Sequence, residues 1–480
     1  MNGWSQDGTP TIVIVGAGFS GTLLAAHLLR QLPPSSIRIV LVEREATVGS
    51  GLAYSACGFP HLLNVPAGRM SAIVEDDTHL LRFIRQQNPD ATPYTYLPRH
   101  LYGEYLRSVL NDAKADAPSS VRLEMIHGET TSIHAVGPKE PVIVNVGARQ
   151  LLADLVVLAT GYPTAGAKFH AADLTTRVAY VTNPFTEHVF QASDRTALLI
   201  GSGLTMADAA VAASECHPNL RMVAVSRHGL LPHRQGSVSA ATHSPPLKAL
   251  ERALVGAPLR GLVRCIRQLC RDAQQKGGDW REVIAPVREL TPHLWQSLSF
   301  ADRSRFLRHV RTYWDIHRHR MPPDTADRIA ELQRTGQLVI RAGHVTQLCE
   351  DGDRIVALWR PRGRYDTHEL WVDRVVECSG PDHRLERTTD PLWRQLLTDG
   401  LAVPDAHGLG VLTALHGALV DVHGRSSQRL FYLGPMLRAT YWEATAVGEL
   451  RVHALGLATM LADHASALNH AAMPRSRARV

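Results

Sequence analysis

Two glycine-rich segments carry the residue types that bind nucleotide phosphates. The first follows the continuous apolar run 11–15 and has the pattern GxGxxG over residues 16–21. In this pattern the first glycine permits a tight turn, the second lets the backbone approach a pyrophosphate, and the third lets a helix pack closely on the sheet. The helix N-terminus then directs partial positive charge at the phosphates. We therefore predict a dinucleotide site at Gly16, Gly18, Phe19, Ser20 and Gly21.

An acidic residue completes this first segment. A helix predicted over Thr22 to Leu32 is followed by a strand predicted over Ile37 to Val42, which ends at Glu43. A carboxylate about twenty residues beyond the glycines accepts the ribose hydroxyls of an adenosine. Strand, glycines, helix, strand and acid in this order predict a βαβ unit with a bound dinucleotide. The alternative is a glycine turn without a ligand.

The second segment, residues 201–206, departs from the pattern. Met206 stands where the third glycine would be, so we expect the following helix to pack less closely on its strand. The next strand, predicted over Met222 to Val225, leads into Ser226 and Arg227 instead of an acid. Because an acid would repel a 2′-phosphate and Arg227 could pair with one, NADPH is modestly favoured over NADH. The predicted residues of this site are Gly201, Gly203, Leu204, Thr205 and Arg227. The alternative for Arg227 is a solvated loop charge.

An internal repeat accompanies the two segments. Residues 121–161 and 338–380 both contain strand-like runs, and both end with an aspartate followed at equal spacing by a glycine. These pairs are Asp154 with Gly161 and Asp373 with Gly380. The repeat predicts a duplicated dinucleotide domain in which each closing strand crosses near a cofactor, at Thr160, Gly161 and Gly380. The alternative is coincidental β structure.

The chain resembles flavoproteins with two dinucleotide-binding domains, and among them a bacterial FAD/NAD(P)-binding family. The resemblance covers nearly the whole chain and is carried by the blocks 49–54, 62–71, 98–105, 201–205, 226–227, 314–320, 434–435 and 442–443. It implies FAD and either NADH or NADPH as cofactors. In related flavoproteins a late strand end and helix N-terminus lie against the flavin, which implies roles there for Gly434, Pro435 and Glu443, with a helix beginning near Glu443.

A loop rich in glycine and proline contains Asn64 and Ser71. Such a loop near the first cofactor could supply amides and hydroxyls to the flavin edge. The alternative is a structural turn.

A long insert, about residues 240–332, has helical periodicity and many arginines. It is a candidate substrate lid or dimer surface. On one helix His317 and Arg320 share a face, as do Asp315 and Arg318. A functional cluster of His317, Arg318 and Arg320 would bind a planar anion, whereas the alternative is a charged face joined by local salt bridges.

Composition indicates a cytoplasmic enzyme without a cysteine relay. The 480 residues are 45% hydrophobic, no apolar run is long enough for a bilayer span, and the polar start of the chain predicts no cleaved leader. The six cysteines form no CxxC pair and fit no common zinc spacing, so neither a dithiol relay nor a metal site is expected. The net charge of +6 can attract anionic cofactors and substrates and does not by itself indicate nucleic acid.

The predicted architecture is α/β, with two Rossmann-like dinucleotide-binding domains and a helical insertion. Residues 1–185 and 381–465 would form the FAD domain, residues 186–380 the NAD(P) domain, and residues 466–480 a disordered basic tail. The sequence gives no oligomeric state.

These features predict a flavin monooxygenase that consumes NAD(P)H and molecular oxygen and hydroxylates a small molecule. Chemistry of this kind requires no covalent nucleophile, and no catalytic residue is predicted. The FAD-dependent urate hydroxylases fall in the resembled family, and the flat urate anion suits a pocket of arginine and histidine. The leading expectation is therefore conversion of urate to 5-hydroxyisourate. The alternatives are N-hydroxylation of an amine or amino acid, and a non-oxygenating NAD(P)H-flavin reductase or redox sensor.

Overall fold

The computed structural model describes residues 9–55, 61–135, 137, 140–163, 179–186, 188–236 and 244–472. The chain divides into two compact units. The first comprises Met1–Ala56, Pro66–Gly166 and Asp382–Val480, and the second comprises Cys57–Val65 and Ala167–Pro381. One boundary between the units lies at residue 166, whereas the sequence analysis predicted it at residue 185. The other lies at residue 381, next to the predicted boundary at residue 380. The predicted α/β class with two Rossmann-like domains is confirmed.

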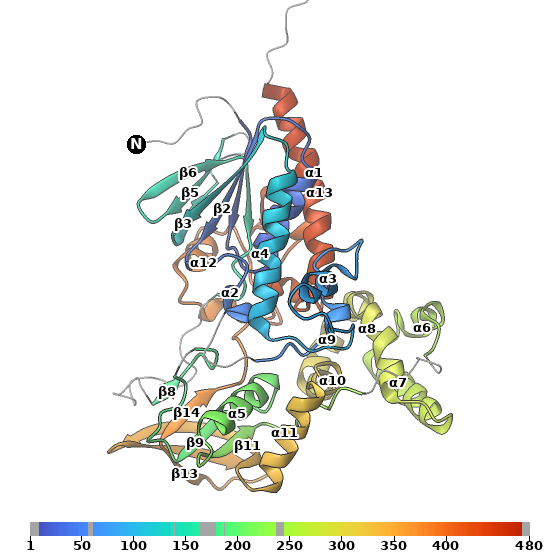
Figure 1. Cartoon of the computed structure of the whole chain (residues 1–480). Coiled ribbons are helices and arrows are strands. Elements are labelled where there is room, and N and C mark those ends of the chain that lie inside the picture. Colours follow the sequence, from blue (N-terminus) through green and yellow to red (C-terminus); the bar gives the residue numbers. More distant parts are fainter. Residues whose placement is uncertain are drawn as a thin grey trace, which may run out of the picture. The chain divides into compact units, whose positions relative to one another are not determined.

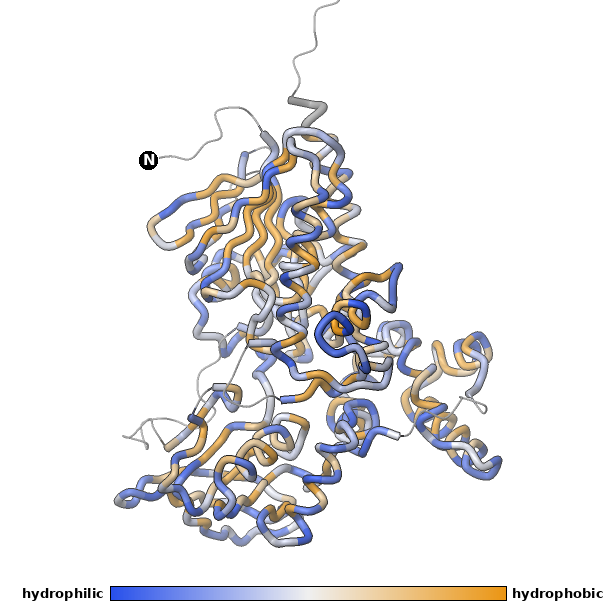
Figure 2. The backbone as a smooth tube through the Cα atoms, viewed as in Figure 1, coloured by the Kyte–Doolittle hydropathy of each residue, from blue (hydrophilic) through white to orange (hydrophobic). Residues whose placement is uncertain are grey.

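The first unit is built on a parallel sheet with one antiparallel edge. Among the described residues the strand order is β15-β16-β7-β1-β2-β3, and only β15 runs antiparallel to its neighbour. Helices α1, α4 and α13 lie side by side in this unit (Figure 1). The central strands are apolar along their whole length (Figure 2), which is the pattern of strands covered on both faces. The bounds are β1 Thr11–Val15, α1 Phe19–Gln31, β2 Ile37–Glu43, α4 Arg99–Asp116, β3 Val121–His127, β7 Leu155–Leu158, β15 Ala418–Val420, β16 Ser426–Tyr432 and α13 Val447–Ala472.

Smaller elements surround this sheet. An antiparallel sheet joins β3 to β7, and short helices lie in the loops. The bounds are α2 Gly51–Tyr54, α3 His79–Arg85, β4 Thr130–His134, β5 Val142–Val146, β6 Arg149–Ala153, α12 Pro391–Thr398 and the 3-10 helices η1 Ala67–Arg69, η4 Leu385–Arg387, η5 Leu415–Gly417 and η6 Pro435–Ala439.

The second unit repeats the plan of the first. Its described strands have the order β13-β12-β11-β10-β9-β14-β8, with α5 and α11 packed on the core of one face. The bounds are β8 Tyr180–Val181, β9 Thr196–Ile200, α5 Leu204–Cys216, β10 Arg221–Ser226, α11 Pro323–Arg334, β11 Leu338–Asp351, β12 Arg354–Pro361, β13 His368–Val372 and β14 Arg374–Glu377. The insert between β10 and α11 is helical: α6 Leu247–Leu254, α7 Leu259–Gln275, α8 Trp280–Ser297, α9 Phe300–Arg305, the π-helical turn η3 Phe306–Val310 and α10 Arg311–Arg318.

Two local expectations near the C-terminus were wrong. The predicted tail begins at residue 466, but α13 continues through Ala472, because this stretch is rich in alanine and extends a helix already packed along α1. Residues 473–480 lie outside the described residues. The helix expected near Glu443 begins instead at Val447, since η6 and a turn occupy the preceding segment.

Within the described part of the chain, no helix combines the length and the apolar character that a membrane span requires.

Candidate cofactor sites

The first glycine turn follows directly from the end of β1. Gly16 has a φ of +99°, and a Cβ there would lie 2.6 Å from the backbone oxygen of Ala159. Its amide donates to the backbone oxygen of Val42 at 2.8 Å. Only glycine fits this turn, because both the left-handed φ and the neighbouring strand end exclude a side chain. The turn therefore brings the chain from β1 into α1 across the carboxyl edge of the sheet.

The start of α1 is arranged to receive an anion. Gly18 is the N-cap and, among the described residues, no side chain caps this end of the helix. Phe19 and Ser20 form the first turn, whose amides have no intrahelical acceptor. A Cβ at Gly21 would lie 1.8 Å from the backbone oxygen of Gly16, so the absent side chain lets α1 pack against the turn. The residues fit a dinucleotide pyrophosphate at the N-terminus of α1.

Glu43 lies at the edge of this cradle, as the last residue of β2. Its Oε2 accepts a hydrogen bond from the amide of Ala17 at 2.6 Å, and its Oε1 accepts one from the amide of Glu45 at 3.0 Å. The carboxylate is thereby fixed beside the glycine turn. Its predicted bond to ribose hydroxyls stays a prediction.

The end of β7 and the end of β16 meet in the first unit. Thr160 accepts a hydrogen bond from the indole nitrogen of Trp393 at 3.1 Å, and Gly161, with a φ of +70°, accepts one from the hydroxyl of Tyr432 at 3.0 Å. Tyr432 thus links the crossover at Gly161 to the segment that contains Gly434 and Pro435. A Cβ at Gly434 would lie 2.7 Å from the Tyr432 hydroxyl, so glycine is required there. The structure brings these predicted residues together at one edge of the sheet.

Glu443 is buried in the turn between η6 and α13, with 2% of its surface exposed. Beside it in the chain, the guanidinium of Arg438 stacks on the ring of Trp442, 3.9 Å from the centroid. Glu443 precedes α13 and does not begin it. The positive helix N-terminus that the sequence analysis expected at this residue therefore does not support a role for Glu443 at the flavin. Its predicted place near the flavin rests on the resemblance.

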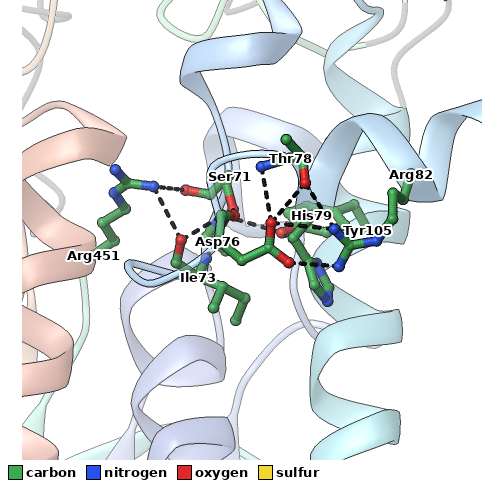
Figure 3. A network of polar contacts seen from close by, with 9 residues as sticks. Ser71, Ile73, Asp76, Thr78, His79, Arg82, Tyr105 and Arg451 are labelled. Atoms are coloured by element: carbon green, nitrogen blue, oxygen red, sulfur yellow. Dashed lines mark hydrogen bonds and ion pairs between the residues drawn. The ribbon is translucent and has the colours of Figure 1, made fainter.

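Ser71 holds its own loop together (Figure 3). The residue is 1% exposed, and its hydroxyl lies 2.6 Å from the backbone oxygen of Asp76 and 3.1 Å from that of Ile73. Because these carbonyls use its hydrogen, the hydroxyl has none to donate to a flavin. Arg451 of α13 donates to the backbone oxygens of Ser71 and Ile73 at 3.0 and 3.1 Å. Ser71 therefore has a structural role in this loop, and its expected contact with the flavin stays a prediction. Asn64 belongs to the second unit.

The second cradle reproduces the first turn. Gly201 has a φ of +120°, a Cβ there would lie 2.6 Å from the backbone oxygen of Cys378, and its amide donates to Val225 at 2.8 Å. Gly203 caps α5, whose first turn contains Leu204 and Thr205, and a Cβ on Gly203 would have no described atom within 4 Å. Protein packing therefore does not require this glycine, whereas close approach of a pyrophosphate does.

Met206 distinguishes the two helices. It is wholly buried and carries a side chain where Gly21 has none. Because a Cβ at Gly21 would overlap the glycine turn, α5 cannot approach Gly201 as closely as α1 approaches Gly16. This agrees with the looser packing that the sequence indicates.

The ribose end of the second cradle has hydroxyls and cations in place of an acid. Ser226 is the last residue of β10, as Glu43 is of β2, and its hydroxyl lies 2.7 Å from that of Ser202. Arg227 follows and is exposed. The sequence reasoning missed the neighbours of Arg227, because they come from β11 and from the turn after β12.

These neighbours form a cationic group around Arg227. Burial, the guanidiniums of Arg362 and Arg227, and His344 together hold the pKa of His228 below its usual range. Burial, Arg227 and Arg360 do the same for the pKa of His344. A bound phosphate would relieve this repulsion, so the group has the chemistry of an anion site.

His317 and Arg320, which the sequence singled out, meet at Trp280. The ring centroids of Trp280 and His317 are 4.8 Å apart, and the Arg320 guanidinium lies 5.8 Å from the Trp280 centroid. The sequence reasoning missed His233, 4.5 Å from His317, and Arg281, 4.3 Å from Trp280. No sequence signal joins them, since they come from separate loops and helices.

The charges of this Trp280 cluster are already partly balanced. Arg281 pairs with Asp279 at 2.7 Å, and burial, His317, Arg281 and Arg320 hold the pKa of His233 below its usual range. Arg318, the third predicted residue, is the last residue of α10. Its predicted contact with substrate stays a prediction.

A comparison with known protein families found a match over the first cradle. Residues 13–163 match a family model described as FAD-NAD(P)-binding. No protein with curated function matched the sequence.

Several solved structures share the fold over almost their whole length. An ornithine hydroxylase from Pseudomonas aeruginosa is 16% identical, with 95% of this chain and 99% of that chain covered and a TM-score of 0.62. An L-lysine 6-monooxygenase from Pseudomonas syringae is 15% identical, with 96% and 99% covered and a TM-score of 0.62. An ornithine N-hydroxylase from Kutzneria sp. 744 is 15% identical, with 95% and 99% covered and a TM-score of 0.59. Together with the family match, the two glycine cradles identify FAD and NAD(P) as the cofactors of this chain.

Proposed function

We propose that the protein is an FAD- and NADPH-dependent monooxygenase that hydroxylates the amine nitrogen of an amino acid. The observation that carries the proposal is similarity over the full length, both units included, to enzymes whose names state N-hydroxylation of ornithine or oxidation of lysine. These names favour the amine alternative over the urate reaction that the sequence put first.

NADPH as the coenzyme is supported by the group around Arg227. The second cradle has Ser226 where the first has Glu43, so no carboxylate at this position repels a 2′-phosphate. The guanidinium of Arg227 can pair with that phosphate through two parallel hydrogen bonds, and the guanidinium of Arg362 is close enough to add to the positive field.

An amino acid as the substrate is supported by the Trp280 cluster. Arg320 offers a charged donor to a carboxylate. The Nδ1–H of His317 donates to the backbone oxygen of Tyr313, 2.7 Å away, and in that tautomer Nε2 accepts a hydrogen bond, which the α-ammonium group of an amino acid can donate. A diamine has no carboxylate for this cluster to recognise. Urate is also an anion, so the choice between the two rests on a substrate panel.

When bound, FAD supplies electron transfer from the nicotinamide and activation of oxygen. The chain positions both cofactors. The glycine turns at Gly16 and Gly201 let α1 and α5 direct their first amides at the two pyrophosphates, and Glu43 is placed to orient the first ribose. Arg227 holds the coenzyme by its 2′-phosphate, and Arg320 orients the substrate by its carboxylate.

The test is a panel of L-ornithine, L-lysine, cadaverine and urate with purified, flavin-loaded protein, oxygen and NADPH. We expect one of the two amino acids to stimulate NADPH oxidation and to yield a product heavier by one oxygen atom on its side-chain nitrogen, detected by mass spectrometry. Stimulation by urate alone would reject N-hydroxylation. Reduction of the flavin by NADPH without oxygen insertion into any substrate would point to the reductase or redox-sensor alternative.

A variant pair tests the assigned carboxylate site. Arg320→Gln should raise KM for the amino acid by about tenfold or more, because a charged hydrogen bond contributes about 1.5–3 kcal/mol. The matched change Arg252→Gln, at an exposed position on α6, should leave KM within about twofold. Equal effects of both substitutions would remove the Trp280 cluster from the proposal and leave the reaction itself untouched.

A further inference from the structure

The positive charge of the protein is concentrated in the helical insert. Residues 244–322 carry 15 Lys and Arg against 7 Asp and Glu, a formal charge of +8, whereas the whole chain carries +6. The rest of the chain is therefore slightly acidic. Neither cofactor cradle explains this concentration, because both cradles are formed by residues outside the insert.

Four of these arginines lie along one face of α7. Arg260, Arg264, Arg267 and Arg271 are spaced four, three and four residues apart, which places them in one row about 16 Å long on α7. All four are exposed. The opposite face of α7 is apolar and contains the buried Leu262, and α7 packs against α8.

The row forms one wall of a groove of about 730 Å³. Arg305 of α9 and His309 of η3 contribute to the lining, and the lining residues include a single carboxylate, Asp302. That carboxylate is already paired with Arg305 at 2.8 Å and accepts the amide of Leu259 at 3.1 Å. Arg305 is thus paired with the single carboxylate of the lining, and the four arginines of the row outnumber that carboxylate.

Three arginines of the row have no anionic partner. Among the residues that the structure describes, none forms a hydrogen bond or ion pair with the side chains of Arg260, Arg264 or Arg267. Arg271 donates to the amide oxygen of Gln268 at 2.5 Å, a neutral group. Like charges at this spacing repel one another and destabilise the helix slightly, so an external anion would stabilise α7.

We propose that this groove is a docking site for a partner protein that presents an acidic helix. A helix with carboxylates spaced four, three and four residues apart matches the row of guanidiniums, each of which can bind a carboxylate through two hydrogen bonds. Apolar side chains also line the groove, Val263 and Val310 among them, and would contact the apolar part of an amphipathic helix.

The lining argues against nucleic acid as the occupant. Surfaces that bind single strands combine cations with aromatic rings on which bases stack. None of the described residues that line the groove is Phe, Tyr or Trp. A nucleic acid could bind the arginines of the groove but would have no aromatic ring on which to stack its bases. An acidic amphipathic helix could bind the arginines and also contact the apolar side chains.

The test uses a fluorescein-labelled, alanine-rich helical peptide with four glutamates at this spacing, titrated with the full-length, flavin-loaded protein. We expect saturable anisotropy that weakens as salt is raised, and weaker binding of a control peptide whose glutamates are distributed around the helix. The variant Arg264→Glu with Arg267→Glu should weaken binding by at least tenfold, and the matched variant Arg252→Glu by less than twofold. The milder pair Arg264→Gln with Arg267→Gln, checked by its unfolding temperature, keeps the test valid if the double charge reversal fails to fold.

Three results would overturn the proposal. One is absence of saturable binding, or an equal loss in the Arg252 variant. Another is tighter binding of a single-stranded oligodeoxynucleotide of the same charge, lost in the groove variant, which would indicate nucleic acid. The third is a change in sedimentation coefficient of the groove variant without peptide, which would show that a second copy of the chain covers this face. None of these measurements depends on the identity of the hydroxylated substrate.

Discussion

Ser226 and Glu43 occupy the same position in the two cradles, at the end of the second strand of each βαβ unit. The carboxylate of Glu43 accepts a hydrogen bond from the amide of Ala17, whereas the hydroxyl of Ser226 is hydrogen-bonded to the hydroxyl of Ser202. This exchange removes a negative charge and leaves the neighbouring Arg227 exposed to a ligand. On the proposed assignment, serine in place of the acid removes the negative charge that would repel a 2′-phosphate.

The consequence at the scale of one residue is a shift in coenzyme preference. Arg227→Glu should raise KM for NADPH by about tenfold to hundredfold, since a charged hydrogen bond contributes about 1.5–3 kcal/mol, and should leave KM for NADH within about threefold. Steady-state oxidation of both coenzymes measures the ratio. Arg221→Glu, at the exposed opposite end of β10, is the matched control. An equal rise in KM for NADH and NADPH would show that Arg227 does not bind the 2′-phosphate.

At the scale of elements, an aspartate directly precedes the strand that ends each internal repeat, β7 in the first unit and β14 in the second. Asp154 accepts the amide of Thr11 at 2.8 Å, and Asp373 accepts the amides of Arg195 and Thr196, also at 2.8 Å. In each unit the aspartate thus links the strand that leads into the glycine turn, β1 or β9, to the strand beside it. The two repeats noticed in the sequence share this contact, which gives the aspartate of each repeat the same structural role.

Removal of this link should destabilise the second unit. Asp373→Ala should lower the free energy of unfolding by about 1–3 kcal/mol, because two amides lose their acceptor, while Asp353→Ala, at the exposed turn after β11, should change it by less than about 0.5 kcal/mol. Burial raises the pKa of Asp373, but the amides of Arg195 and Thr196 outweigh burial and hold that pKa below its ordinary range.

Since the folded pKa of Asp373 is depressed, its contribution is present above the unfolded value of about 4 and is lost as pH falls through the folded pKa. Urea unfolding at several pH values should show the difference between the variant and the natural protein shrinking below about pH 4. A difference that stays constant down to acid pH would contradict this role.

At the scale of the whole molecule, each unit has its own core and its own nucleotide cradle. A ligand that binds one folded unit stabilises that unit by about 2.7 kcal/mol at a hundredfold excess over Kd. We expect calorimetry to resolve a transition that FAD raises and a second that NADPH raises, and removal of FAD to lower only the first.

Gly16→Ala tests the origin of the FAD effect. The added methyl would meet the backbone oxygen of Ala159 at a left-handed φ, so the variant should lose both FAD retention and the stabilisation by FAD, while the shift caused by NADPH persists. Gly147→Ala, also at positive φ but with no described atom within 4 Å of its Cβ, is the control and should still bind FAD. Loss of both ligand shifts in Gly16→Ala would contradict independent cradles.

The turn residues and strands of both cradles could be predicted because their signals are local. Gly16 and Gly201 follow apolar β-branched runs and precede helices, and a left-handed turn between two such elements accepts little other than glycine. Met206 likewise predicted a looser helix from one side chain. Ser71 and Glu443 could not be placed in the same way: a hydroxyl in an irregular loop takes whichever carbonyl the fold brings near, and a helix start depends on packing as well as on propensity.

By itself the sequence determined the α/β class, the two glycine cradles and the exchange of acid for serine and arginine, since each depends on residues close together in the chain. Only the tertiary structure decided which side chains join Arg227, His317 and Arg320, and that four arginines of α7 face one groove. Those groups assemble from segments far apart in the chain, and packing, not local preference, selects which distant residues meet.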